Sequence, residues 1–290
     1  MAHLREILFR TPTVSVGAFR CDPTDEQFGQ LARVRGHVIV FPRRSVHIMQ
    51  AGCQRLFADP LISVFYNRHQ EYCREAVAGQ GDYSDFYEFS SESVASCVGR
   101  YEPSAIDRLD APFSVNFGWS DARCYALQRH VFNVVSERRT PIDSLWVEEC
   151  MLHVLECCVD AAFQRRGIAL KKMSLKTRHA HEQRVRATRE VIDQGFGQRL
   201  TLTDIARQVH TSEFHLSRMF RAKTGYSIHQ YLLQRRLRAG LNAISEGADD
   251  LTRLALDLGF SSHSHFTNAF RRAFGAPPSS YRELPAVLRN

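Results

Sequence analysis

The sequence predicts an α+β protein in which a β-rich N-terminal part is followed by an all-helical C-terminal part. Three observations lead to this fold class. Residues 12 to about 115 contain short β-prone runs separated by Gly, Pro, Asp and Ser. From Ser120 onward apolar side chains recur at helical spacing, and the last hundred or so residues contain one structural unit twice. A chain of 290 residues is long enough for two domains that each bury a core.

Short strands are predicted where Val, Ile, Phe and Tyr cluster between turn residues. These segments are Val14 to Phe19, Val38 to Phe41, Leu61 to Tyr66 and Tyr83 to Phe89. Such a pattern predicts a small barrel or sandwich. Two helices follow, from Asp121 to Arg138 and, after Pro141, from Asp143 to about Arg165. The short turn between them predicts an antiparallel pair.

Composition excludes a membrane span, because no apolar run approaches the length that crosses a bilayer. Arg5, Glu6 and Arg10 interrupt the N-terminus, which therefore lacks the apolar region of a signal peptide. We expect a cytoplasmic protein without a membrane partner.

The net charge of +7 is distributed unevenly along the chain. From Lys171 onward there are 20 Lys and Arg against 10 Asp and Glu, whereas the remainder has 18 against 21. A basic C-terminal part indicates a polyanionic partner, for which nucleic acid is the first candidate. The cationic stretch that begins at Lys171 predicts a linker over 171–183, between domains at 1–170 and 184–290.

The repeat has a period of 50 residues. Its matched positions are Leu216, Phe220, Arg221, Gly225 and Tyr231 in the first copy, and Phe266, Phe270, Arg271, Gly275 and Tyr281 in the second. A fixed period indicates that one structural unit occurs twice.

A short amphipathic helix is predicted before each copy, from apolar residues at i, i+3, i+4 and i+7. These residues are Leu202, Ile205, Ala206 and Val209, then Leu251, Leu254, Ala255 and Leu258. Thr201 with Asp204 can cap the first helix and Asp250 the second. A tight turn follows at His210-Thr211 or Gly259-Phe260, after which Ser212 or Ser261 begins another helix. A helix, a short turn and a capped helix form the helix-turn-helix pattern.

The second helix of each unit has an apolar face and a polar face. The apolar faces are Leu216, Met219 and Phe220, then Phe266, Ala269 and Phe270. The polar faces are Phe214, Ser217, Arg218 and Arg221, then Ser264, Thr267, Asn268 and Arg271. Polar and cationic side chains on an exposed helix can reach base edges in a DNA major groove. A long helix from about Ser227 to Ser245, which carries Arg235, Arg236 and Arg238, could hold the two units ~34 Å apart, in successive grooves.

These segments resemble the DNA-binding domain of the AraC/XylS family over roughly 100 residues. The second half carries the signature Gly259-Phe-Ser, Phe266, Phe270, Gly275, Pro278 and Tyr281-Arg282. The resemblance implies base contacts from Phe214, Ser217 and Arg218 and from His263, Ser264, His265, Thr267 and Asn268. The alternative for His263 and His265 is that each is a solvated turn residue. Two positions depart from the family pattern: His210 replaces a Gly in the first turn, and Gly240 replaces an Ala in the linking helix. Both changes predict that the first unit, or its coupling to the second, is looser than is usual in the family.

The resemblance also implies a cupin-like β-barrel at the N-terminus that binds a small-molecule effector and is followed by dimerising helices. His69 and Glu71 are the candidate effector contacts, since they would share a face if their strand continued. A metal is disfavoured there because no second histidine pair completes the site. Trp146, Cys150, His153 and Cys157 line one side of the second helix, where packing is favoured over soft-metal binding. Leu145, Leu152 and Val159 form a further apolar row, which favours a homodimer interface.

The pattern as a whole predicts a sequence-specific regulator of transcription that is not an enzyme and holds no cofactor. We expect double-stranded DNA as its partner, with RNA polymerase as a candidate protein partner. A metalloenzyme and a zinc-dependent DNA-repair methyl acceptor are the alternatives. The latter is disfavoured because Cys21, Cys53, Cys73 and Cys97 are too widely spaced. An architectural DNA-bender does not need paired base-reading faces. The sequence does not decide between activator and repressor.

Overall fold

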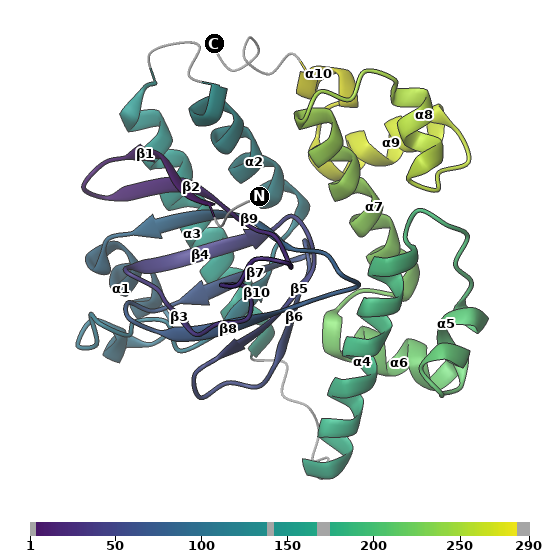
Figure 1. The fold of residues 1–290 in the computed structure, drawn as a ribbon, viewed down its shortest axis with the longest axis horizontal. Helices are drawn as coiled ribbons and strands as arrows, with labels where there is room; N and C mark the ends of the chain where they lie inside the picture. The colour runs from purple at the N-terminus through teal and green to yellow at the C-terminus, as the bar shows by residue number, and fades with distance from the viewer. Residues whose placement is uncertain (1–3, 138–141, 167–174, 283–290) are drawn as a thin grey trace. The chain divides into compact units, whose positions relative to one another are not determined.

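The structure, a computed structural model, describes residues 4–137, 142–166 and 175–282. Its contacts divide the chain into two units, Met1–Ile168 and Ala169–Asn290 (Figure 1). Within the described ranges, no helix combines the length and apolar content that crossing a bilayer requires. The α+β class is confirmed, since the first unit combines antiparallel strands with helices and the described residues of the second unit form helices without strands.

Two antiparallel sheets form the first unit. The larger has the strand order β1-β2-β9-β4-β7-β10 and the smaller β3-β8-β5-β6. The strands are β1 Leu4–Arg10, β2 Val14–Cys21, β3 Ala32–Arg33, β4 His37–Pro42, β5 Val46–Gln50, β6 Leu56–Ala58, β7 Ile62–Tyr66, β8 Glu71–Ala76, β9 Asp82–Phe89 and β10 Phe117–Trp119. The four predicted segments are confirmed as β2, β4, β7 and β9, which are neighbours in the larger sheet.

Helices cover the larger sheet. They are α1 Ser91–Gly99, the short 3-10 turn Pro103–Ala105, α2 Ala122–Glu137 and α3 Ser144–Arg166. The predicted pair is α2 and α3, which contact each other and reach β1, β2 and β10. Asp121 and Asp143 accept backbone N–H groups at the starts of α2 and α3, which fixes where each helix begins.

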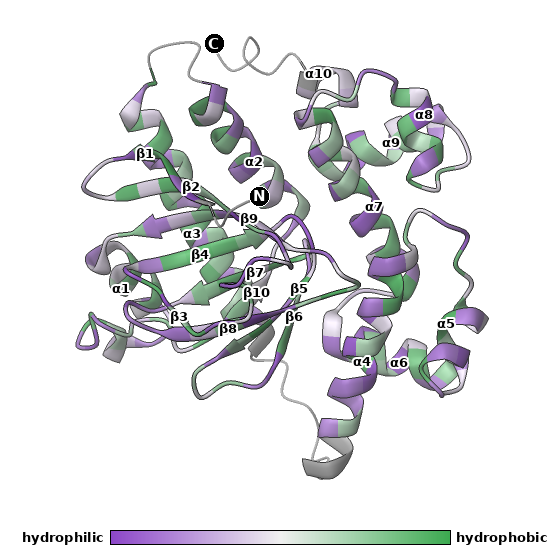
Figure 2. Ribbon diagram, viewed as in Figure 1, coloured by the Kyte–Doolittle hydropathy of each residue, from purple (hydrophilic) through white to green (hydrophobic). Residues whose placement is uncertain are grey.

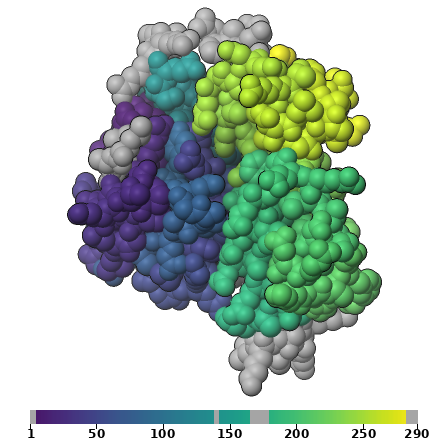
Figure 3. Space-filling model, turned by 45° about the vertical axis from the view of Figure 1, so that its right-hand side comes forward, coloured from purple at the N-terminus to yellow at the C-terminus, as the bar shows by residue number. Residues whose placement is uncertain are grey.

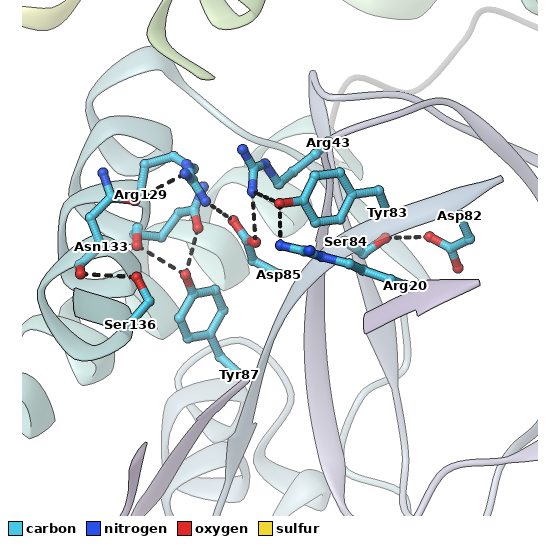
Figure 4. Close-up of polar contacts among 11 residues, drawn as sticks. Arg20, Arg43, Asp82, Tyr83, Ser84, Asp85, Tyr87, Arg129, Asn133 and Ser136 are labelled. Carbon is cyan, nitrogen blue, oxygen red and sulfur yellow. Dashed lines mark hydrogen bonds and ion pairs between the residues drawn. The ribbon is translucent and has the colours of Figure 1, made fainter. Parts of the chain in front are cut away.

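An ion-pair cluster fastens α2 to the larger sheet. Asp85 on β9 is fully buried, and its Oδ2 accepts from Arg129 Nη1 at 2.6 Å, while Arg43 Nη1 lies 3.9 Å from Oδ1 (Figure 4). Tyr87, two residues further along β9, donates from its hydroxyl to Gln128 Oε1 at 2.6 Å. Because buried charges are strongly destabilising unless paired, these contacts make the position of α2 specific.

The second unit is entirely helical in its described residues. Its helices are α4 Leu175–Gly195, α5 Leu202–Gln208, α6 Glu213–Thr224, α7 Ile228–Ser245, α8 Leu251–Asp257, α9 His263–Phe274 and α10 Pro278–Arg282. Helix α7 contacts α6, α9 and α10, and α4 contacts α5 and α6. Hydrophobic and hydrophilic residues alternate around these helices (Figure 2). In the space-filling view the helices of this unit form two lobes (Figure 3).

The linker predicted over 171–183 is wrong from Leu175 onward, because α4 begins at that residue. Residues 171–174 lie outside the described ones. Contacts with α6 explain the helix: Glu182 accepts from Lys223 Nζ at 2.8 Å, and the His181 ring lies 5.2 Å from that of His215. The polar composition of this stretch therefore reflects a helix face that meets charged partners.

Candidate nucleic-acid interface

The first helix-turn-helix unit consists of α5 and α6. The hydroxyl of Thr201 accepts from the backbone N–H of Asp204, and that of Ser212 accepts from His215, so both predicted caps are confirmed. His210 in the turn has a φ of 51°, the left-handed conformation that favours glycine. Thr203 donates to Glu213 Oε1 at 2.6 Å and holds the two helices together.

The second helix-turn-helix unit, α8 and α9, repeats this geometry with a turn one residue longer. Asp250 caps α8 by accepting from Thr252 and Arg253, as predicted. Ser262 caps α9, so the prediction of Ser261 is wrong by one residue. The hydroxyl of Ser261 instead lies 3.0 Å from Nδ1 of His265. The extra turn residue moves the cap without changing the helix that follows.

Helix α6 separates its residues as predicted. Leu216, Met219 and Phe220 are buried against the rest of the unit. On the opposite face the Phe214 side chain is 73 % exposed, and the Arg218 guanidinium lies 5.7 Å from its ring centre. Arg221 is exposed and Ser217 is half-buried. One continuous polar and aromatic surface results.

Helix α9 presents the matching surface. Phe266 and Phe270 are fully buried, whereas Ala269 is half-buried. The polar side chains predicted to contact DNA are exposed, except for the half-buried Thr267; they are His263, Ser264, His265, Asn268 and Arg271. Both histidines lie in the first turn of α9 rather than in the preceding turn, and Nε2 of His263 is 3.4 Å from the Thr267 hydroxyl.

The arginines of α7 serve the packing of the unit. Arg235 donates from Nε to Asp193 Oδ1 at 2.6 Å, and both side chains are less than a tenth exposed. Arg236 donates to the backbone carbonyls of Phe196, Gln198 and Gly259. Burial lowers the pKa of Arg236. Part of the positive charge on α7 is therefore engaged in contacts within the protein.

Gly240 marks the closest approach between α7 and the second helix-turn-helix unit. A Cβ at this position would lie 2.9 Å from Cε2 of Phe266 and 3.1 Å from Cδ1 of Leu258. Both neighbours are buried. The expectation that Gly240 loosens the coupling is therefore wrong, because the missing side chain admits the Phe266 ring.

The effector contacts predicted in the first unit do not share a strand face. Strand β7 ends at Tyr66, and His69 lies in the following turn with a φ of 62°. Glu71 begins β8, where it pairs with Arg33 at 3.3 Å. The strand stops because this turn reverses the chain between the two sheets.

Two predictions for α3 have different outcomes. In the row expected at a dimer interface, Val159 is fully buried in its own unit and Leu152 half-buried, whereas Leu145 is 65 % exposed. In the other stripe, Cys157 Sγ lies 3.6 Å from His153 Nε2. Trp146 is half-buried, with its ring edge-on to that of His130. This stripe packs at least in part, as expected.

Comparisons with known proteins agree with this geometry. A family model described as a helix-turn-helix domain matches residues 205–284. The regulatory protein SoxS of Salmonella typhimurium is 33% identical over 103 residues, which cover 36% of this chain and 96% of SoxS. The chain belongs to the AraC/XylS family. This AraC-type protein is thus a helix-turn-helix DNA-binding regulator of transcription.

A further relative and two solved structures are also similar to this AraC-type chain. The right origin-binding protein of Escherichia coli is 36% identical over 88 residues, and the chain spans 30% of it. The C-terminal domain of AraT from Geobacillus stearothermophilus has 28% identity and a TM-score of 0.34, covering 35% of this chain and 84% of that one. ToxT from Vibrio cholerae has 10% identity and a TM-score of 0.36, covering 96% and 100%.

Proposed function

We propose that the protein reads two successive major grooves of double-stranded DNA, with α6 in one and α9 in the next. The observation that carries this proposal is the pair of matched exposed faces, each on the second helix of its unit and each backed by buried aromatic residues. Recognition helices of this motif contact base edges through such a face. Helix α7 contacts both helix-turn-helix units and would therefore set the distance between α6 and α9.

Within these faces we assign base contacts to two side chains with distinct chemistry. The Arg218 guanidinium can donate two hydrogen bonds to guanine, and the Asn268 amide can pair with adenine. Phe214, Ser217, Arg221, His263, Ser264, His265, Thr267 and Arg271 complete the proposed DNA-contacting set.

Selection of binding sites from random DNA tests both the contacts and the spacing. Arg218→Ala should weaken binding by ~1–3 kcal/mol and relax preference at one base pair, and Asn268→Ala should relax another. The two relaxed positions should lie about 10 bp, or one helical turn, apart. If both variants relax the same or adjacent base pairs, the two helices do not read separate grooves.

Arg253→Ala is the matched control. Arg253 is exposed on α8, the first helix of its unit, where a contact with the DNA backbone would carry no sequence information. Its loss should leave the selected motif unchanged. An unchanged motif in Arg218→Ala as well would remove Arg218 from the base-reading set.

We further propose that the first unit is a cupin-like barrel that binds a small-molecule effector and joins two copies of the chain. A cavity of about 440 Å³ between its sheets supports the effector, and the exposed Leu145 supports a dimer surface on α3. RNA polymerase is the proposed protein partner at regulated promoters. Leu145→Asp should convert dimers to monomers in sedimentation, since a charge in an apolar interface is unfavourable. A folded Leu145→Asp protein that remains dimeric would contradict this interface.

A further inference from the structure

Three cysteines meet where α2 and α3 pack side by side (Figure 1). Cys124 lies on α2, and Cys157 and Cys158 are neighbours on α3. The Sγ atoms of Cys124 and Cys158 are 3.7 Å apart, although the two residues are separated by 34 positions in the chain. The thiol of Cys157 also forms a hydrogen bond with that of Cys124. We call these three residues the thiol cluster.

The thiol cluster has a buried pair and a more accessible third member. Cys124 and Cys158 are 4 % and 1 % exposed. Cys157 is half-buried, and its Sγ lies 3.6 Å from Nε2 of His153, whose side chain is 64 % exposed. A reagent that enters from solvent beside His153 would therefore reach Cys157 first and the buried pair second.

The surroundings of the thiol cluster disfavour a negative charge on sulfur. The hydrogen bond with Cys124 and burial both raise the pKa of Cys157, and the carboxylates of Asp121 and Asp160 raise it further. Burial also raises the pKa of Cys97, on α1, to about 12. Because the thiolate is the nucleophilic form of cysteine, these thiols should react slowly with oxidants and alkylating agents. A product in which the sulfur atoms stay uncharged fits this site better than an anionic complex.

The geometry also limits which electrophiles the thiol cluster can hold. Among the described residues, no group of three or more His, Cys, Asp or Glu side chains is placed so that it could hold a metal ion. Structural zinc takes four such ligands, so the cluster does not suit zinc. Two adjacent thiols instead suit a thiophilic centre that needs two sulfur ligands, because soft sulfur selects soft partners. Trivalent arsenic with one organic substituent meets both conditions, since its complex with two thiols is neutral.

We propose that Cys124 and Cys158 bind a monosubstituted trivalent arsenical, R–As(OH)2, with Cys157 as the first thiol to react. Each sulfur of the pair forms one S–As bond, and each thiol proton leaves with an arsenic hydroxyl as water. Two thiols and R–As(OH)2 thus give one neutral bridge and two water molecules, and neither sulfur nor arsenic is oxidised or reduced. Transfer from Cys157 to the pair breaks its S–As bond and returns to it the proton of the attacking thiol.

The bridge would join α2 to α3 by covalent bonds, at a point where the reduced thiols make only weak hydrogen bonds. Binding of the arsenical needs neither DNA nor a second copy of the chain. The inference therefore goes beyond the proposed function and does not rest on it.

Native mass spectrometry of the reduced full chain tests the binding with phenylarsine oxide, which hydrates to a monosubstituted trivalent arsenical. One equivalent should stay bound in a large excess of 2-mercaptoethanol, because a bridge to two sulfur atoms of one chain resists exchange with a monothiol. The dithiol 2,3-dimercaptopropanol should remove it. Loss of the arsenical to 2-mercaptoethanol overturns the proposal.

Single-cysteine variants identify the two sulfur atoms. Cys124→Ala and Cys158→Ala should each lower the retained arsenical at least about tenfold, whereas Cys157→Ala should slow its uptake and leave the final stoichiometry unchanged. Cys124→Val, which removes the sulfur and keeps an apolar side chain, takes the place of Cys124→Ala if circular dichroism shows a loss of fold. Retention in Cys124→Ala together with loss in Cys157→Ala would assign the arsenical to the adjacent pair on α3 and overturn the proposal.

Cys150→Ala is the matched control for these variants. Cys150 is half-buried on α3, as Cys157 is, but does not belong to the thiol cluster. Its replacement should change neither the rate of uptake nor the amount retained. If Cys150→Ala lowers retention as much as Cys158→Ala does, the binding is not specific to the thiol cluster and the assignment fails.

Discussion

Replacing Asp193 by Ala should destabilise the second unit severely, because it leaves the Arg235 guanidinium buried without its counter-ion. The two side chains join α4 to α7, and each is less than a tenth exposed. Besides the 2.6 Å contact with Asp193, the guanidinium of Arg235 stacks 4.1 Å from the ring centre of Phe196, so the aromatic ring occupies one side of its plane. Removing one partner of a buried ion pair costs about 3–5 kcal/mol.

For a unit of this size the loss corresponds to a fall of about 10–20 °C in its melting temperature. Scanning calorimetry of the full chain would follow the unfolding of the second unit. The double variant Asp193→Leu with Arg235→Met should recover most of the lost stability, since apolar replacement of a buried pair is often neutral or stabilising.

Asp257→Ala is the matched control for Asp193→Ala. Asp257 lies 3.8 Å from Arg253 in an exposed pair of the same unit, with both side chains more than half accessible to solvent. Exposed pairs contribute at most about 1 kcal/mol. If Asp193→Ala lowers the melting temperature no more than Asp257→Ala does, the buried pair does not hold α4 against α7.

Three further predictions concern stability measured by urea unfolding. His210→Gly should stabilise the second unit by up to about 0.5 kcal/mol, because relief of the left-handed backbone exceeds the entropy that glycine adds to the unfolded chain; a loss of stability would contradict this. Gly240→Ala should destabilise it by up to about 2 kcal/mol, since overpacking against Phe266 outweighs the gain in helix propensity, and a rise in stability would show that the ring can move. Burial lowers the pKa of His130, so the folded state binds fewer protons than the unfolded state and the first unit should lose stability as pH falls below about 6.5. His130→Gln should reduce that slope, and an unchanged slope would assign it to other groups.

The sequence predicts the DNA-binding unit well because its signals are local. A hydroxyl or carboxylate at a helix start, as at Thr201, Ser212 and Asp250, satisfies backbone groups only two or three residues away. The apolar faces of α6 and α9 also follow from helical spacing alone. Ser262 was missed because Ser261 has the same capping chemistry, and only the longer turn decides between them.

Long-range contacts account for what the sequence does not reveal. Asp193 and Arg235 are 42 residues apart, and no pattern distinguishes Arg235 from an arginine that faces DNA. The close fit of Gly240 to Phe266 likewise depends on how α7 and α9 meet, so propensity alone gives the wrong sign for its effect. In the first unit, β-prone residues predict strands, but the cavity arises only where two sheets face each other.

The side chain of Arg236 connects the segment before the first helix-turn-helix unit with the turn of the second. Its guanidinium binds the carbonyls of Phe196 and Gln198, which precede the first helix-turn-helix unit, and that of Gly259 in the turn of the second. These hydrogen bonds oppose independent tilting of the two helix-turn-helix units. Under the proposed mode of binding, the protein would then tolerate base substitutions in graded steps, whereas one inserted base pair between the two contacted segments would rotate them out of phase. The base sequence of the binding sites would thus vary over evolution, whereas the spacing between the two contacted segments would stay constant.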